Sequence, residues 1–158
     1  MPDMVDPIHS LISFQQAYEN KLISLSPCNL DKSMRVLLDN ANDSPRITYA
    51  IIDGIRVKAL AIYLPAEPIG KIHCFGLGYA VAEDFRLQGY GKRVIESSIE
   101  EMRHGFKIHL QQFYIEAIVG VDNAGSNKLA SRFLSTSPKE CNDIYSGVPA
   151  RQYLRLIS

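Results

Sequence analysis

The sequence predicts an α/β (α+β) domain with a mixed, mostly antiparallel central sheet flanked by helices. Two observations support this prediction: a hairpin signal in the middle of the chain and a strand–helix–strand order after it. A hairpin joins antiparallel strands, whereas the strand–helix–strand unit requires a right-handed parallel crossover. The length of 158 residues suits a single domain over 1–158, in which residues 1–20 form an N-terminal helical extension.

The apolar residues before the hairpin follow a mainly helical pattern. Residues 7–19 place apolar side chains partly on one face, which predicts a helix, and residues 21–25 suit a short strand. A second helix is expected over residues 29–41, where the apolar side chains recur at helical spacing: Leu30, Met34, Leu37, Leu38 and Ala41.

The middle of the chain predicts an antiparallel meander. Residues 47–52 form a β-rich run, and Asp53-Gly54 is a turn signal because both residue types tolerate a positive φ. A second strand follows over 55–64 and ends at Pro65, and a third covers 72–81.

The pattern then changes to alternating helices and strands. An amphipathic helix is expected over 89–102, a buried strand over the apolar run 113–121, and another helix over 123–134. Residues 135–149 have the composition of a loop, and 151–157 can form a last strand.

The composition excludes several classes of function. Lys and Arg total 17, as do Asp and Glu, so no nucleic-acid partner is expected. Three widely spaced cysteines form no metal-ligand pattern, which predicts no metal site and favours reduced thiols in the cytoplasm. No apolar run is long enough to predict a membrane span. The sequence leaves open whether the chain forms a homodimer.

The segment 79–92, YAVAEDFRLQGYGK, has the features of an anion-binding turn. A strand runs out near Val81, and Gly89 and Gly91 begin a helix whose first amides lack acceptors within the helix. Arg86, Lys92 and Arg93 add positive charge nearby. The alternative is a tight turn that binds nothing. The P-loop and dinucleotide-binding glycine patterns are both absent.

These residues resemble a known family. Arg86-x-x-Gly89-x-Gly91 is similar to the R/Q-x-x-G-x-G/A signature of the GNAT superfamily of N-acetyltransferases. Asn123, Ser126 and Leu129 resemble the N-x-x-A/S-x-x-L start of the next family helix. The resemblance extends from about residue 21 onward, and it implies a GNAT-like acyl-CoA N-acyltransferase fold.

The resemblance also implies an activity and a ligand. The chain would move the acetyl group of acetyl-CoA, a co-substrate, to a primary amine of a small molecule or peptide by direct attack. A backbone amide near Val81 would hold the oxyanion. The diphosphate and the pantetheine arm would contact Tyr79, Ala80, Val81, Arg86, Leu87, Gln88, Gly89, Tyr90, Gly91, Lys92, Asn123 and Ser126.

The chain departs from the family at the catalytic acid. Many members have a Tyr directly after the helix Leu, where this chain has Ala130. The remaining catalytic candidates are Tyr145 as the acid and His73 or Glu116 as the base. Each has a structural alternative: a loop tyrosine, a hydrogen-bonded strand histidine and an ion-paired carboxylate. A non-catalytic acyl-CoA-binding module or sensor is therefore the alternative function.

Overall fold

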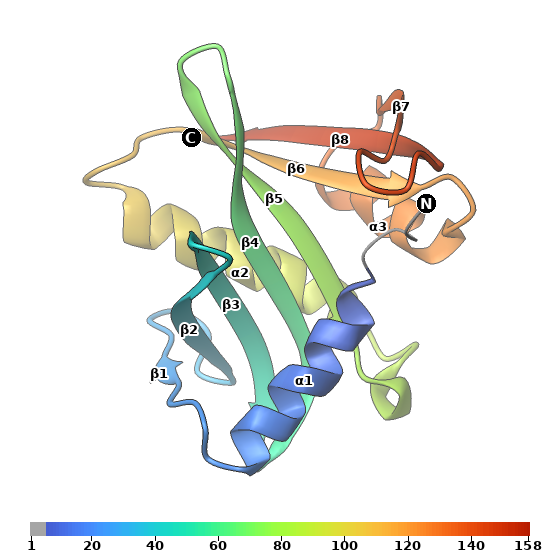
Figure 1. The fold of residues 1–158 in the computed structure, drawn as a ribbon. Coiled ribbons are helices and arrows are strands. Elements are labelled where there is room, and N and C mark those ends of the chain that lie inside the picture. The colour runs from blue at the N-terminus through green and yellow to red at the C-terminus, as the bar shows by residue number, and fades with distance from the viewer. Residues whose placement is uncertain (1–5) are drawn as a thin grey trace.

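A computed structural model, which describes residues 6–158, shows one sheet of eight strands in the order β1-β2-β3-β4-β5-β6-β8-β7 (Figure 1). Every neighbouring pair is antiparallel except β5 and β6, which are parallel. The predicted mixed, mostly antiparallel sheet is therefore confirmed. The strands are β1 (Ser26–Pro27), β2 (Met34–Ala41), β3 (Ser44–Asp53), β4 (Arg56–Ile69), β5 (Ile72–Val81), β6 (Phe113–Gly120), β7 (Lys139–Asn142) and β8 (Pro149–Ile157).

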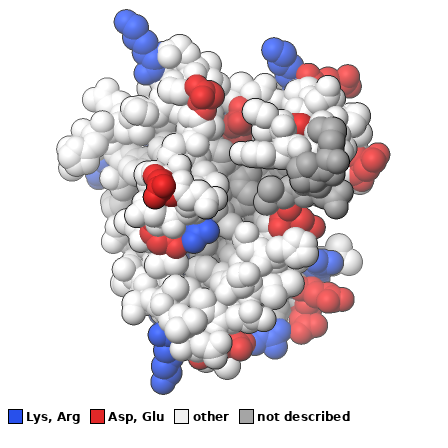
Figure 2. Space-filling view, viewed as in Figure 1, with Lys and Arg blue, Asp and Glu red and all other residues white. Residues whose placement is uncertain are grey.

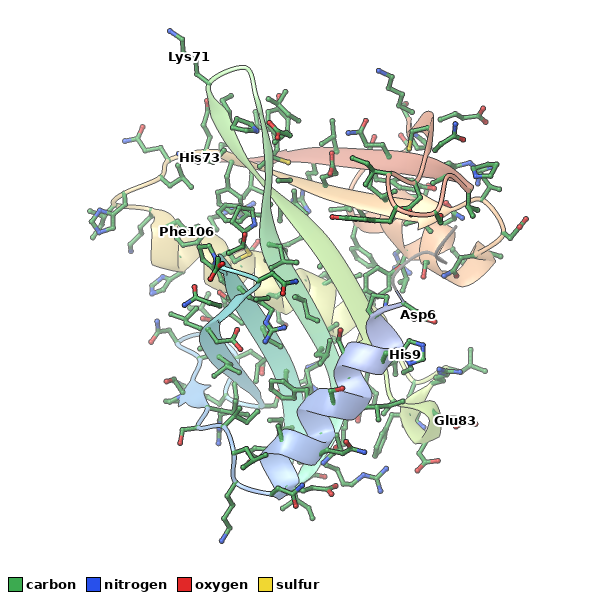
Figure 3. The ribbon with its side chains drawn as sticks, viewed as in Figure 1. Asp6, His9, Lys71, His73, Glu83 and Phe106 are labelled. Carbon is green, nitrogen blue, oxygen red and sulfur yellow. The ribbon has the colours of Figure 1, made fainter. Side chains whose placement is uncertain are left out.

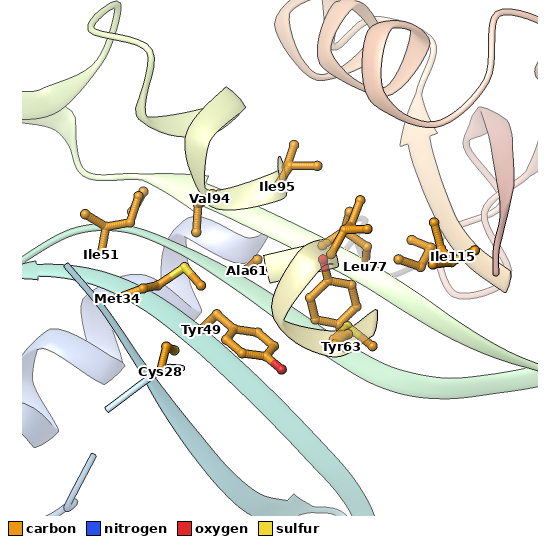
Figure 4. Packing of buried hydrophobic residues seen from close by; sticks show 14 of the residues in the cluster. Cys28, Met34, Tyr49, Ile51, Ala61, Tyr63, Leu77, Val94, Ile95 and Ile115 are labelled. Carbon is orange, nitrogen blue, oxygen red and sulfur yellow. The ribbon is translucent and has the colours of Figure 1, made fainter. Parts of the chain in front are cut away.

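Helices cover both faces of the sheet. On one face α1 (Pro7–Glu19) crosses β4 and β5. On the other face α2 (Tyr90–Phe106) packs on β3, β4 and β5, while α3 (Ala124–Phe133) packs on β6 and β8. The main core lies between α2 and the sheet, where Tyr63 and Ile95 are fully buried (Figure 4). The Tyr63 hydroxyl is paired there with Ser98 Oγ at 2.7 Å.

The predicted helix over 7–19 is confirmed, and its start has a clear local cause. Asp6 is the N-cap, and its carboxylate accepts a hydrogen bond from the Ile8 amide at 3.0 Å. Pro7 follows in the first turn, where its missing N–H has no consequence. The predicted extension also includes residues 1–5, which lie outside the described residues.

The helix predicted over 29–41 is wrong, because these residues contain strand β2. The helical spacing of its apolar residues is equally compatible with a short strand of partly buried residues. Asn42 and Asp43 have φ of +50 and +66, so they form a two-residue hairpin turn that joins β2 to β3. The strand predicted over 21–25 is also wrong, because the structure has no strand there and β1 comes after it.

Several other boundaries also differ from the prediction. The β3–β4 turn consists of Gly54 and Ile55, one residue later than predicted. β4 continues past Pro65, because its pairing with β3 stops at Tyr63 and the proline therefore removes no bond to β3. The segment predicted as a loop over 135–149 contains β7 at the edge of the sheet. No helix of the described residues is long and apolar enough to cross a membrane.

Candidate active site

The sheet forks between β5 and β6. These strands pair at only three positions, and the last of them joins Gly76 to Glu116. β5 continues to Val81 and β6 to Gly120, but no further pairing between them occurs in the described chain. β5 therefore has one edge paired with β4 and one open edge that faces the fork.

The open edge presents backbone groups of alternate β5 residues. The Ala82 amide donates to the Lys58 carbonyl at 2.9 Å, so Ala82 faces β4. Because backbone groups alternate along an antiparallel strand, Ala80 also faces β4, whereas Tyr79 and Val81 point theirs toward the fork. Two of the three strand residues predicted to bind the cofactor therefore have suitable backbone directions.

The loop after β5 leads into a helix whose first amides are unpaired. Gly89 is the N-cap of α2 and has a φ of +85, a left-handed conformation that glycine adopts without a steric cost. The Arg93 amide donates to the Gly89 carbonyl at 3.1 Å, whereas the amides of residues 88–92 have no acceptor in the described part of the chain. Such a helix start favours a phosphate group.

The loop is closely packed behind Gly91 and open in front of Gly89. A Cβ at Gly91 would lie 3.0 Å from Leu129 Cδ1 and 3.5 Å from Val81 Cγ2, so a glycine lets α2 approach α3 and β5 closely. A Cβ at Gly89 would meet nothing within 4 Å, so the front of the loop is open. Free amides beside open space are the arrangement that an anion needs.

The basic side chains near the loop differ in their surroundings. Arg86 and Lys92 are exposed at its surface, as are Leu87 and Gln88. Arg93 instead points to the segment before β2, where it pairs with Asp31 at 3.3 Å and donates to Ser33.

Asn123 and Ser126 form the start of α3 beside the fork. The Asn123 side chain is the N-cap and accepts a hydrogen bond from the Ser126 amide at 3.1 Å. The Ser126 carbonyl accepts one from the Tyr79 hydroxyl at 2.9 Å, so Tyr79 links β5 to α3. Burial raises the pKa of Tyr79, which keeps this phenol protonated.

Ala130 lies in a space that a β8 side chain fills. It is buried together with Ala117, Val119 and Tyr153. The Tyr153 hydroxyl donates to Asn127 Oδ1 at 2.7 Å. A tyrosine at position 130 would therefore collide with packed side chains.

Glu116 lies at the apex of the fork, on the face that carries α1. Its neighbours Ile115 and Ala117 are buried on the opposite face, as strand alternation requires. Glu116 Oε2 accepts a hydrogen bond from Gln152 Nε2 at 2.6 Å. Sequence reasoning missed Gln152, because only the register that pairs Ile118 with Gln152 brings the two side chains together.

The other two catalytic candidates lie at different places. His73 is exposed near the start of β5, and Figure 3 shows it at the opposite end of the molecule from Glu83, which lies in the loop between β5 and α2. Tyr145 is 66% exposed in the β7–β8 loop, where its amide donates to Asp143 Oδ2 at 3.2 Å. In the described chain neither side chain is hydrogen-bonded to Glu116.

A cavity of about 400 Å³ lies on the same face as Glu116, between α1 and strands β2 to β4. Phe14, Leu60 and Ile62 form apolar walls, and the half-buried pair of Asp39 and Arg46 lies 2.6 Å apart at its side. Ile62 is the register partner of Gly78 in β5, so the cavity extends to within one strand of the fork. Figure 2 shows that most of this face is uncharged.

Comparisons with known proteins agree with this geometry. The model of the acetyltransferase (GNAT) family matches residues 14–134. A GNAT-family acetyltransferase from Streptococcus pneumoniae has a TM-score of 0.56 at 13% identity, over 98% of this chain and 96% of that one. A ribosomal-protein-alanine N-acetyltransferase from Brucella melitensis has a TM-score of 0.53 at 18% identity, over 98% and 81%.

A ribosomal-protein alpha-N-acetyltransferase, RimL, in complex with coenzyme A has a TM-score of 0.51 at 24% identity, over 71% of this chain. This chain spans 62% of the length of RimL. No curated protein matches. The structural likenesses confirm the fold, and the family model covers most of the sequence. The chain therefore belongs to the acetyltransferase (GNAT) family.

Proposed function

We propose that this chain moves the acetyl group of acetyl-CoA to a primary amine of a small molecule or peptide. The observation that supports this proposal is a series of unpaired backbone groups along β5 and at the start of α2. The strand has an open edge at Tyr79 and Val81, and residues 82–87 connect it to the unpaired amides of residues 88–92 at the start of α2. Acetyl-CoA has the matching shape, since a diphosphate lies at one end of a thin arm that carries amide groups.

Backbone groups perform the proposed binding. The amides of residues 88–92 hold the diphosphate, and exposed Arg86 and Lys92 contribute positive charge. Tyr79 and Val81 bind the arm as a further strand would bind, through their outward N–H and C=O groups. A backbone amide near Val81 faces the thioester and stabilises negative charge on its oxygen.

Glu116 is the proposed base for the acceptor amine. A primary amine is protonated at neutral pH and has to lose a proton before it can attack, and a carboxylate at the fork apex can accept it. Gln152 holds the carboxylate in place through the 2.6 Å hydrogen bond. The cavity beside α1 would receive the body of the acceptor, because it lies on the same face as Glu116.

The base assignment has a direct test. Glu116→Gln should lower kcat at least tenfold (about 1.4 kcal/mol in the barrier) and leave the affinity for acetyl-CoA unchanged. His73→Gln serves as the comparison. Loss of activity in the His73 variant together with normal activity in Glu116→Gln would assign the base to His73.

Two tyrosines compete as the proton donor to the leaving thiolate. Tyr145 is exposed and belongs to a loop, whereas the Tyr79 hydroxyl is held at α3 beside the fork. Tyr145→Phe and Tyr79→Phe each remove one hydroxyl. The variant that lacks the true donor should have a lower kcat and a smaller fall of kcat at alkaline pH. A variant with an unchanged profile excludes its tyrosine.

Isothermal titration with acetyl-CoA tests the proposed function as a whole. The folded wild-type chain should bind acetyl-CoA, and an absence of binding would overturn the proposal. A thiol-release assay with a panel of amines then tests transfer. RimL and the Brucella melitensis protein are named for transfer to ribosomal proteins, so peptides with a free N-terminal amine belong in that panel.

A non-catalytic CoA-binding module is the second candidate, and the burial of Ala130 favours it. The residue at the family position of the general acid is Ala130, which is packed against Tyr153. It has no proton to donate to the leaving thiolate. Turnover with any amine rejects this alternative.

A cytoplasmic location is part of the main proposal, and it is supported by the three free cysteines, of which Cys28 and Cys74 are buried.

A further inference from the structure

A β-bulge directs Lys58 toward residues 82–89, the proposed phosphate loop between β5 and α2. Ile51 pairs with Ala59 and the next residue, Ile52, pairs with Val57, so Lys58 is an extra residue in β4. Val57 packs on the side of α1 and Ala59 on the side of α2, which shows that the alternation is reset at this point.

The Lys58 ammonium contacts both aromatic residues that flank the loop. Its Nζ lies 5.2 Å from the centre of the Phe85 ring and 5.0 Å from that of Tyr90, and it donates to the Tyr90 hydroxyl at 2.9 Å. The two rings meet edge to face at 6.0 Å. Asp53 lies 3.7 Å from Nζ, and the Lys58 side chain is only 19% exposed.

A second cation contacts the start of the same loop. The Arg56 guanidinium lies 5.3 Å from the centre of the Phe85 ring and pairs with Asp84 at 3.0 Å. Both cations belong to the β3–β4 hairpin, so this hairpin holds the loop from one side. Between Phe85 and Tyr90 lie four exposed residues, 86–89, of which Leu87 and Gly89 have positive φ.

We propose that Lys58 is a positioning residue for acetyl-CoA, which holds Phe85 and Tyr90 so that the amides of residues 88–92 keep one arrangement before the ligand arrives. The inference rests on the proposed function and adds a residue that touches neither the ligand nor the reacting atoms. A preformed set of donors binds more tightly, because less conformational freedom is lost on binding. The ammonium is suited to this role because it attracts two ring faces and donates to a phenol at once.

The experiment compares Lys58→Met with Lys58→Arg, and with Lys71→Met as the matched control. Lys71 is an exposed residue of the β4–β5 turn, at the far end of the molecule from the loop (Figure 3). We expect Lys58→Met to raise both the Kd and the KM for acetyl-CoA about tenfold and to leave kcat at saturating acetyl-CoA unchanged. Lys58→Arg should restore most of the affinity, because a guanidinium also stacks on aromatic rings and donates to oxygen.

The outcomes separate this inference from the proposed function. If wild-type protein does not bind acetyl-CoA, the proposed function fails and Lys58 is irrelevant. If wild-type protein binds acetyl-CoA, two results for Lys58→Met would overturn the positioning role. One is an affinity equal to that of wild type, and the other is a lower kcat with an unchanged KM. Equal losses in Lys58→Met and Lys71→Met would also overturn it. Melting temperatures verify that each variant is folded.

Discussion

Glu101 shows how one side chain can fix a segment that has no regular structure. It lies on α2 and is 6% exposed. Its carboxylate accepts hydrogen bonds from three consecutive backbone amides, at 3.1 Å from Asn29 and 2.9 Å from Asp31, with Leu30 between them. A buried anion is stable only when its acceptor capacity is used in this way.

We therefore expect Glu101→Gln to lower the free energy of unfolding by about 1–3 kcal/mol, because an amide NH₂ would face N–H donors. Urea denaturation monitored by circular dichroism measures the change. Glu100→Gln is the control, since this neighbour is half exposed and, among residues 6–158, pairs only with Arg103. Equal effects of the two substitutions would contradict the interpretation.

The buried cysteines predict a dependence of stability on alkaline pH. Burial, with a smaller contribution from Glu101, raises the pKa of Cys28 from 9.0 to about 12. The unfolded thiol therefore ionises first, so this contribution to stability is complete below pH 9 and is lost as the pH rises toward 12.

Urea denaturation at about pH 8 and about pH 10 tests this dependence. Wild-type protein should lose more stability between the two values than Cys28→Ala, which has no thiol to ionise. Parallel losses in both proteins would assign the alkaline sensitivity to other groups, such as the buried hydroxyls of Tyr49 and Tyr63, whose pKa values burial also raises.

At the scale of elements, the junction of β5 and α2 depends on two glycines with different functions. Gly91 permits close packing against Leu129, whereas Gly89 permits a left-handed conformation in front of open space. A substitution at Gly91 therefore disturbs the interior, and one at Gly89 acts mainly on the loop. This difference makes Gly89 the better position for a test of the phosphate site.

Gly89→Glu should abolish the binding of acetyl-CoA, because a carboxylate would lie where the diphosphate binds. Gly89→Ala is its control: both variants bear the strain of a positive φ, about 1 kcal/mol, but only the glutamate adds charge. Calorimetric titration should show weakened binding by the alanine variant and none by the glutamate variant. Equal affinities in the two variants would place the anion elsewhere.

The predictable part of the fold is the part with strong local signals. Strand β5, both later helices and the glycine loop follow from turn chemistry and periodicity that neighbouring residues share. The apolar spacing over 29–41 predicts a helix where the structure has β2, because a short segment does not separate the helical period from the strand period and pairing with β3 decides the outcome. The partners Gln152 and Lys58 could not be predicted, because a strand register and a bulge bring them into place.

At the scale of the whole molecule, the fork divides the sheet into two parts. Strands β1 to β5 form one part and β6, β8 and β7 the other, and only three register positions join them. α2 packs on the first part and α3 on the second, and the two helices contact each other. Together they cover one face of the sheet. A ligand bound in the fork would thus connect the two parts.

Acetyl-CoA should therefore slow amide hydrogen exchange on both sides of the fork. We expect the largest effects in residues 77–81, 88–93 and 123–127, and little change in the β2–β3 hairpin. Saturating ligand should also stabilise the fold, by about 2.7 kcal/mol at a concentration of 100 Kd. Protection confined to residues 88–93 would mean that the diphosphate binds without the arm entering the fork.

Pro7 and Gly78 lie so close that neither position is independent of the other. A Cβ at Gly78 would come within 3.2 Å of Pro7 Cγ, so the first turn of α1 rests directly on the backbone of β5 beside the fork. Protein interiors have little spare volume. A relative with a larger residue at position 78 therefore needs a smaller residue at position 7, or a shift of the first turn of α1. Positions 7 and 78 should therefore covary among close relatives. The contact with β5 limits which residues can begin α1.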